Sequence, residues 1–259
     1  MRTFNKLILT TSLTLAAGAV RAAQLLALGS DGMLHTIDTD MLSVTASMQV
    51  AGAKDLRGMD VRPADGMIYA ISGATQLYTL DPATGKATPG VELLVALPGS
   101  GHAVVDFNPV ADRLRLLAAD GTNLRANVKT GEVATDGSVA YSADFDEADM
   151  MAKVVAGAYT NSYVGTEKTE LYTVDLTTGM LMLQNPPNDG IQQPVGELAK
   201  GLETAAMDIV SDGMDSNITY VLAGKTLHTI DLKTGTPTPL GNIADLPDGI
   251  IDIAVLPAM

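Results

Sequence analysis

The chain has 259 residues, of which 46% are hydrophobic and 18% charged, a balance typical of a folded globular protein. Its 30 acidic residues outnumber its 16 lysines and arginines, and the resulting net charge of −14 disfavours nucleic acids and anionic membranes as partners. Cysteine is absent, which excludes disulfides, thiolate metal sites and a cysteine nucleophile within this chain.

Residues 1–22 have the pattern of a secretory signal peptide. Arg2 and Lys6 precede an apolar run that ends at Val20 and is too short to span a bilayer comfortably. Small residues favour cleavage after Ala22, with neighbouring alanines as alternative sites and a buried N-terminal helix as the alternative structure. We expect a periplasmic or extracellular bacterial protein in which residues 23–259 form one domain with no membrane span.

One short pattern recurs along the rest of the chain: an aliphatic, a bulky, a small and an aliphatic residue, followed by Asp or Asn. Apolar and polar residues alternate in it, so each copy predicts a β-strand. In the last four copies a Thr-Gly pair follows at a fixed offset, which predicts a tight turn into another strand. The copies end at Asp38, Asp81, Asn127, Asp175 and Asp231, with spacings of 43, 46, 48 and 56 residues.

A second pattern, an acid among hydrophobic residues, lies upstream of the first. A turn and one more strand separate the two patterns, so each unit holds four strands in about 45 residues, the period of a propeller blade. We therefore expect the first pattern to form the third strand of every unit. The acids of the second pattern are Asp60, Asp106, Asp208 and Asp252, and the segment 154–160 lacks one.

The two ends of the mature chain complement one another. The first unit, starting near Leu25, lacks an inner strand, and residues 249–257 form an inner strand with nothing after it. Joining them removes two free sheet edges. We predict an all-β protein, a β-propeller of five four-stranded blades closed by the C-terminal strand. Four blades with a stray strand, and six blades with one undetected, are the alternatives.

Four short motifs stand out beside the repeats. They are Asp106-Phe107-Asn108-Pro109, Asp112-Arg113-Leu114-Arg115, Ala158-Tyr159-Thr160-Asn161 and Gln184-Asn185-Pro186-Pro187-Asn188-Asp189-Gly190. Together they resemble an uncharacterised family of exported bacterial proteins, described only as a domain of unknown function. This resemblance covers nearly all of the mature chain and implies a propeller-like exported domain, without implying any catalytic residue.

The four repeated acids are the first candidate site. Inner strands of a propeller line its axis, so Asp60, Asp106, Asp208 and Asp252 are expected to form a partial ring of carboxylates. Such a ring could hold Ca²⁺ or Mg²⁺, which take oxygen ligands. Alternatively, each carboxylate accepts backbone amides of its own or the next blade, and a once-per-blade residue favours this role. The sequence establishes no cofactor beyond this candidate cation.

Three further residues are expected near the channel mouth. His102 has no counterpart in the other units and precedes an inner strand, where an imidazole could bind a metal or transfer protons. Arg57 and Glu203 are also expected to precede inner strands, and together with His102 they could bind a small polar ligand. The alternative is three unrelated loop residues. His35 and His228 occupy a repeat position that Tyr also fills, which indicates packing.

The leading functional hypothesis is an exported, non-catalytic binding or interaction module with a possible protein partner, which the segment 184–195 would contact. The familiar hydrolase and phosphate-binding motifs are absent from the sequence. A hydrolase of esters, lactones or glycans that uses Asp60, Asp106 and His102 is the first alternative. A structural or adhesive matrix protein is the second.

Overall fold

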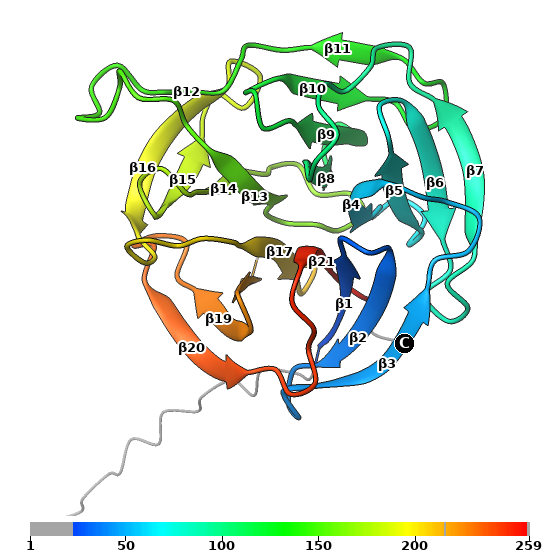
Figure 1. Cartoon of the computed structure of the whole chain (residues 1–259). Helices are drawn as coiled ribbons and strands as arrows, with labels where there is room; N and C mark the ends of the chain where they lie inside the picture. The colour runs from blue at the N-terminus through cyan, green and yellow to red at the C-terminus, as the bar shows by residue number, and fades with distance from the viewer. Residues whose placement is uncertain (1–22, 215, 258–259) are drawn as a thin grey trace, which may run out of the picture.

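Five antiparallel β-sheets surround a central axis in the computed structural model, which describes residues 23–214 and 216–257 (Figure 1). This arrangement confirms the predicted five-bladed β-propeller. The signal peptide predicted at residues 1–22 lies outside the described residues. Within the described part of the chain the regular structure is all strand, and no helix there could cross a membrane.

We number the blades by their place in the chain and give their strands from the axis outward. Blade 1 consists of β21 (Ile250–Val255), β1 (Gln24–Gly29), β2 (Met33–Asp38) and β3 (Ser43–Gln49). Blade 2 consists of β4 (Leu56–Val61), β5 (Ile68–Ser72), β6 (Gln76–Leu80) and β7 (Ala87–Glu92). Blade 3 consists of β8 (Val104–Asn108), β9 (Arg113–Leu117), β10 (Asn123–Ala126) and β11 (Val133–Thr135).

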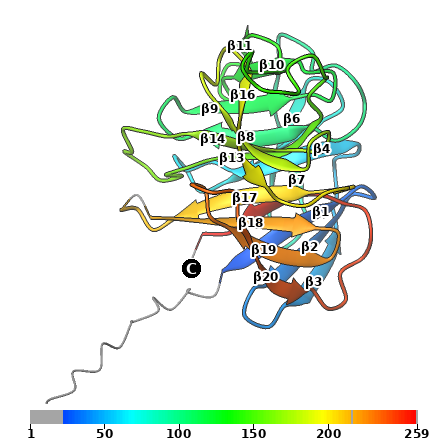
Figure 2. The same cartoon turned by 90° about the vertical axis from the view of Figure 1, so that its left-hand side faces the viewer.

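The last two blades follow the same plan with one addition. Blade 4 consists of β13 (Val154–Tyr159), β14 (Leu171–Asp175), β15 (Met180–Gln184) and β16 (Ile191–Glu197), and β12 (Ala140–Tyr141) pairs in parallel with β16 at its outer edge. Blade 5 consists of β17 (Ala206–Ser211), β18 (Asn217–Ala223), β19 (Thr226–Ile230) and β20 (Pro237–Asn242). In Figure 2 the strands of blade 5 follow one another outward from β17 to β20.

The ring closes as predicted, through its first and last strands. β21 is the inner strand of blade 1 and pairs with β1 in antiparallel register, with Leu25 opposite Val255 and Ala27 opposite Ile253. Both strands are almost completely buried. Neither therefore presents a free edge to another molecule.

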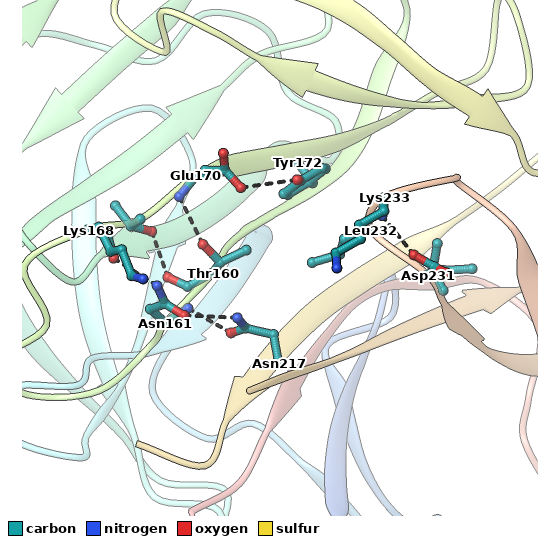
Figure 3. Close-up of a pocket in the computed structure, with 11 residues that line it drawn as sticks. Thr160, Asn161, Lys168, Glu170, Tyr172, Asn217, Asp231, Leu232 and Lys233 are labelled. Carbon is teal, nitrogen blue, oxygen red and sulfur yellow. Dashed lines mark hydrogen bonds between the residues drawn. The ribbon is translucent and has the colours of Figure 1, made fainter. Parts of the chain in front are cut away.

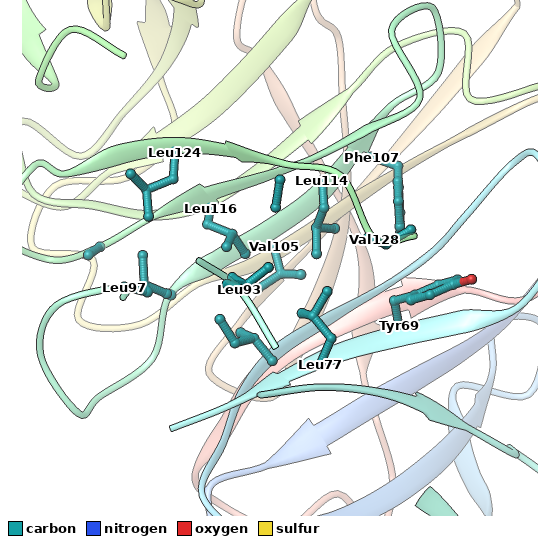
Figure 4. Close-up of a cluster of buried hydrophobic side chains, with 14 residues drawn as sticks. Tyr69, Leu77, Leu93, Leu97, Val105, Phe107, Leu114, Leu116, Leu124 and Val128 are labelled. Carbon is teal, nitrogen blue, oxygen red and sulfur yellow. The ribbon is translucent and has the colours of Figure 1, made fainter. Parts of the chain in front are cut away.

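The hydrophobic core lies between neighbouring blades, because each sheet buries the faces it turns toward its two neighbours. Figure 4 shows one such cluster, where Leu77 of blade 2 packs against Val105 and Leu116 of blade 3. Tyr69 and Phe107 meet edge to face in the same cluster, with their ring centroids 5.4 Å apart. Similar clusters fill the joints between blades 1 and 2, 4 and 5, and 5 and 1.

Blade 4 departs from the predicted order of strands. The fourth copy of the repeated pattern, Leu171–Asp175, is β14, the second strand of its blade, whereas the other four copies are third strands. β14 pairs directly with the inner strand β13. The prediction was wrong here because alternating apolar and polar residues suit the second strand as well as the third. One consequence is that Asp175 is buried, while the corresponding Asp81 and Asp231 are exposed.

Removing residues 250–259 should abolish cooperative unfolding. The truncation deletes β21, uncovers one edge of β1 and takes away the inner wall of blade 1. Urea unfolding followed by circular dichroism measures the effect. A control that lacks only residues 257–259, which follow the strand, should keep the midpoint of the full chain. An unchanged midpoint in the longer truncation would show that this pairing does not stabilise the ring.

Candidate functional site: the axial carboxylates

The inner strands of four blades each direct one aspartate toward the neighbouring blade close to the axis. We call Asp60 (β4), Asp106 (β8), Asp208 (β17) and Asp252 (β21) the axial carboxylates. Their exposed fractions are only 5–6%. Blade 4 has Ala158 at the position that corresponds to Asp106, since the residues after them, Phe107 and Tyr159, donate equivalent amides.

Each axial carboxylate accepts a hydrogen bond from a backbone amide of the next inner strand. This is the second of the two predicted roles, in which the acids join blades. Three of the carboxylates also accept the amide of the residue that follows them. The bonds between blades are Asp60 to Phe107 N at 2.7 Å, Asp106 to Tyr159 N at 2.9 Å, Asp208 to Val255 N at 2.5 Å and Asp252 to Met59 N at 2.8 Å.

The axial carboxylates also lie close to one another. Oxygen atoms of Asp60, Asp106 and Asp208 all fall within 4.8 Å of each other, whereas Asp252 is not part of this group. Burial is the main cause that raises the pKa of all four carboxyls, because it disfavours the charged form. Repulsion between the acids adds to the effect at Asp60, Asp106 and Asp252, and the pKa of Asp208 rises to about 6.

These raised pKa values predict that, in the presence of a chelator, the protein loses stability as the pH rises. An unfolded Asp releases its proton near pH 4, whereas folded Asp208 keeps it up to about pH 6. Between these values the folded state binds more protons, so the free energy of unfolding falls with rising pH. For Asp208 alone the loss is about 3 kcal/mol.

Urea unfolding at a series of pH values measures this dependence, and Asp208→Asn, which cannot titrate, should flatten it. Asp189→Asn is the control, because Asp189 is exposed on a surface turn. A free energy of unfolding that rises between pH 4 and pH 6 would contradict the prediction.

His102 links the inner parts of three blades. It lies just before β8; its Nδ1 is 3.1 Å from the carbonyl oxygen of Arg57 in β4, and its Nε2 contacts the carbonyl of Val155 in β13. Burial lowers the pKa of the imidazole, against the opposing effect of the two carbonyls. Both ring nitrogens therefore face the chain's own backbone. His35 differs, because only its Nδ1 has a partner, the Ser47 hydroxyl at 2.8 Å, while its buried Nε2 has none among the described residues.

The other two residues predicted to bind a ligand differ in burial, and Arg57 lies within β4 and not before it. The guanidinium of Arg57 is buried and donates to backbone carbonyls, among them Leu97 at 3.0 Å and Pro98 at 2.7 Å, so that it holds the loop before β8. Glu203 is exposed in the segment before β17. A binding role for Arg57, His102 and Glu203 stays a prediction.

Polar side chains of the sequence motifs join blades 3 and 4. The buried guanidinium of Arg115 donates to Asp136 at 2.6 Å within blade 3. It also donates across the joint to the hydroxyl of Tyr159 at 3.1 Å and to the side chain of Asn188 at 2.8 Å. The segment 184–195, which the sequence suggested as a partner-binding loop, thus supplies side chains to the protein's own interior.

A similar cluster of polar side chains around an arginine joins blades 2 and 3. Arg62 follows β4 and donates through Nε to Asp112 at 2.7 Å, in the turn between β8 and β9. The same guanidinium pairs with Asp65 and lies 5.9 Å from the ring centroid of Tyr69. The sequence reasoning missed these arginines. The signal available was Arg62 and Arg115 within otherwise apolar strand segments, where a buried cation needs acidic partners.

The fold and its ring of buried acids define the chain as a five-bladed β-propeller protein. Residues 33–254 match the family model of a domain of unknown function, DUF4394, and the chain belongs to this family. The family relationship expected from the motifs is thereby confirmed. No curated protein matches the chain.

Two of the solved structures to which the chain is similar come from Bacteroides species. A protein of unknown function from Bacteroides thetaiotaomicron gives a TM-score of 0.56 at 17% identity, over 91% of this chain and 64% of that one. The chain therefore spans less than two thirds of that protein's length. An auxiliary nutrient binding protein from Bacteroides ovatus gives 0.46 at 14% identity, over 76% and 56% of the two chains. Identities this low show the fold alone.

Proposed function

We propose that this protein is an exported, non-catalytic binding module, in which a rigid propeller carries a recognition surface on its exterior. The observation that carries the proposal is the use of the axial carboxylates. Each accepts a backbone amide of the next blade, so the acids at the axis maintain the ring. His102, the candidate base, has both nitrogens against backbone carbonyls.

Export is part of the proposal and rests on the charge pattern and apolar run of residues 1–22. The absence of cysteine fits a protein whose stability outside the cytoplasm depends on packing. The net charge of −14 favours a neutral or cationic partner over an anionic one.

The main alternative is a hydrolase that uses Asp60, Asp106 and His102. We expect no hydrolysis that depends on Asp106, because its carboxylate is buried and engaged with Tyr159. Hydrolysis of p-nitrophenyl esters and glycosides and of simple lactones, by wild type and Asp106→Asn, tests this. Circular dichroism establishes that the variant is folded. If the wild type hydrolyses one of these substrates and the folded variant does not, the hydrolase replaces the binding proposal.

A divalent cation at the axis is the second element of the proposal. The candidate ligands are the oxygens of Asp60, Asp106 and Asp208, which approach one another within 4.8 Å. Buried carboxylates at this separation repel one another when ionised. Ca²⁺ or Mg²⁺ would neutralise that repulsion through oxygen ligands, and no organic cofactor is implied.

Excess Ca²⁺ should therefore raise the melting temperature at neutral pH above its value in chelator. Saturation at about 100 times the dissociation constant corresponds to about 2.7 kcal/mol, or a rise of about 5–10 °C for a chain of this size. Differential scanning fluorimetry measures the rise, which Asp106→Asn should abolish and Asp189→Asn should retain. Equal melting temperatures in chelator, Ca²⁺ and Mg²⁺ would contradict the cation proposal. The axial carboxylates would then be stabilised by protonation and by their amide hydrogen bonds.

A further inference from the structure

We propose that the ligand site of this binding module is a pocket in the joint between blades 4 and 5, and that it takes a small, neutral, hydroxyl-rich ligand of the saccharide class. The inference rests on the proposed binding function and gives it a place and a chemistry. The pocket has a volume of about 790 Å³ (Figure 3). We call it the blade 4–5 pocket; its lining includes Thr160, Lys168, Glu170, Tyr172, Asn217 and Lys233.

The joint that contains the pocket differs from the other four. It is the one joint among the described blades that no axial carboxylate crosses, since β13 has Ala158 where β8 has Asp106. The two blades are joined instead by a reciprocal pair of amides: Asn217 accepts from the backbone of Asn161 at 2.8 Å and donates to its side chain at 2.8 Å. This pair lies at the edge of the pocket (Figure 3).

The wall formed by blade 4 is held in place by its own hydrogen bonds. The amide of Glu170 donates to the Thr160 hydroxyl at 2.9 Å, and the Thr169 hydroxyl donates to the Thr160 carbonyl at 2.6 Å. Asn161 donates to the carbonyl of Lys168 at 3.0 Å. The motif that contains Thr160 and Asn161, to which the sequence alone gave no role, therefore shapes this wall.

Blade 5 forms the opposite wall with a turn that is also held by its own hydrogen bonds. Asp231 accepts the amide of Lys233 through its side chain at 2.8 Å and the amide of Gly235 through its carbonyl at 2.8 Å. Two walls that are already ordered lose little conformational freedom when a ligand binds, which favours affinity. A volume of this size is also within the range of ordinary small-molecule sites.

The lining determines the class of ligand. Lys168 and Lys233 balance Glu170 and Asp231, so the pocket has no net charge to select a cation or an anion. The exposed side chains of the lining are Lys168, Glu170 and Lys233, with Asp231 beside them, and together they supply both hydrogen-bond donors and acceptors. Tyr172 is only 8% exposed, and its hydroxyl fixes the Glu170 carboxylate at the pocket by donating to it at 3.1 Å. A lining of balanced charge that offers both donors and acceptors matches the many hydroxyl groups of a neutral mono- or disaccharide.

The equivalent turn in blade 2 supplies the residues for a substitution that tests the site. The turn Asp81–Gly85 of blade 2 has the same backbone hydrogen bonds as Asp231–Gly235, and in both turns the Asp carboxylate accepts the amide two residues on. Pro82 and Ala83 stand there in place of Leu232 and Lys233. The double change Leu232→Pro with Lys233→Ala thus removes two side chains from the pocket while keeping a turn that the fold already uses. The matched control is Pro82→Leu with Ala83→Lys.

Isothermal titration calorimetry with glucose, galactose, N-acetylglucosamine and lactose measures binding. We expect at least one sugar to bind the wild type, the blade 5 variant to bind it at least about 10-fold more weakly, and the blade 2 control to bind it unchanged. Glu170→Gln, which alters one acceptor in the wall, should also weaken binding.

Three results would overturn the inference: no heat of binding at sugar concentrations of about 10 mM, equal loss in both turn variants, or sugar binding unaffected by the blade 5 change. The last would leave a binding module with its site elsewhere. Hydrolysis that depends on Asp106 would instead end the proposed function, so the two failures are distinguishable.

Discussion

The structure depends on carboxylates that are removed from water and compensated by backbone amides of a neighbouring sheet. An isolated buried charge is costly, and the amides offset this cost only where blades meet in the correct register. Each axial carboxylate thus ties the position of one inner strand to that of the next. Protonation adds to this compensation, since burial raises the pKa of all four groups.

The joints between blades are chemically unequal although the blades repeat. The joint of blades 2 and 3 combines the apolar packing of Leu77 and Val105 with the ion pair of Arg62 and Asp112. The joint of blades 3 and 4 contains the buried guanidinium of Arg115. The joint of blades 4 and 5 combines an apolar interior with the amide pair of Asn161 and Asn217. A polar pocket can form there because the polar contacts lie toward the surface.

Much of the architecture could be predicted because it depends on patterns that recur. The repeated acids gave the inner strands, and the unpaired ends of the chain gave the closure through β21. The strand order of blade 4 could not be predicted, because alternation of apolar and polar residues alone does not distinguish a second strand such as β14 from a third strand. The roles of Arg57 and His102 depend on carbonyls of distant loops and strands, which no local pattern indicates. Glu203 was grouped with them by spacing along the chain, which does not determine exposure.

The pairing of β1 with β21 has a kinetic consequence. Leu25 cannot meet Val255 until nearly the whole domain has emerged, so the ring is among the last features to form. Contacts this distant in sequence slow folding, because the entropy of bringing the ends together is lost before the contact forms. A partly synthesised chain would leave the inner edge of β1 without a partner strand, a state that a chaperone can bind before the domain becomes rigid.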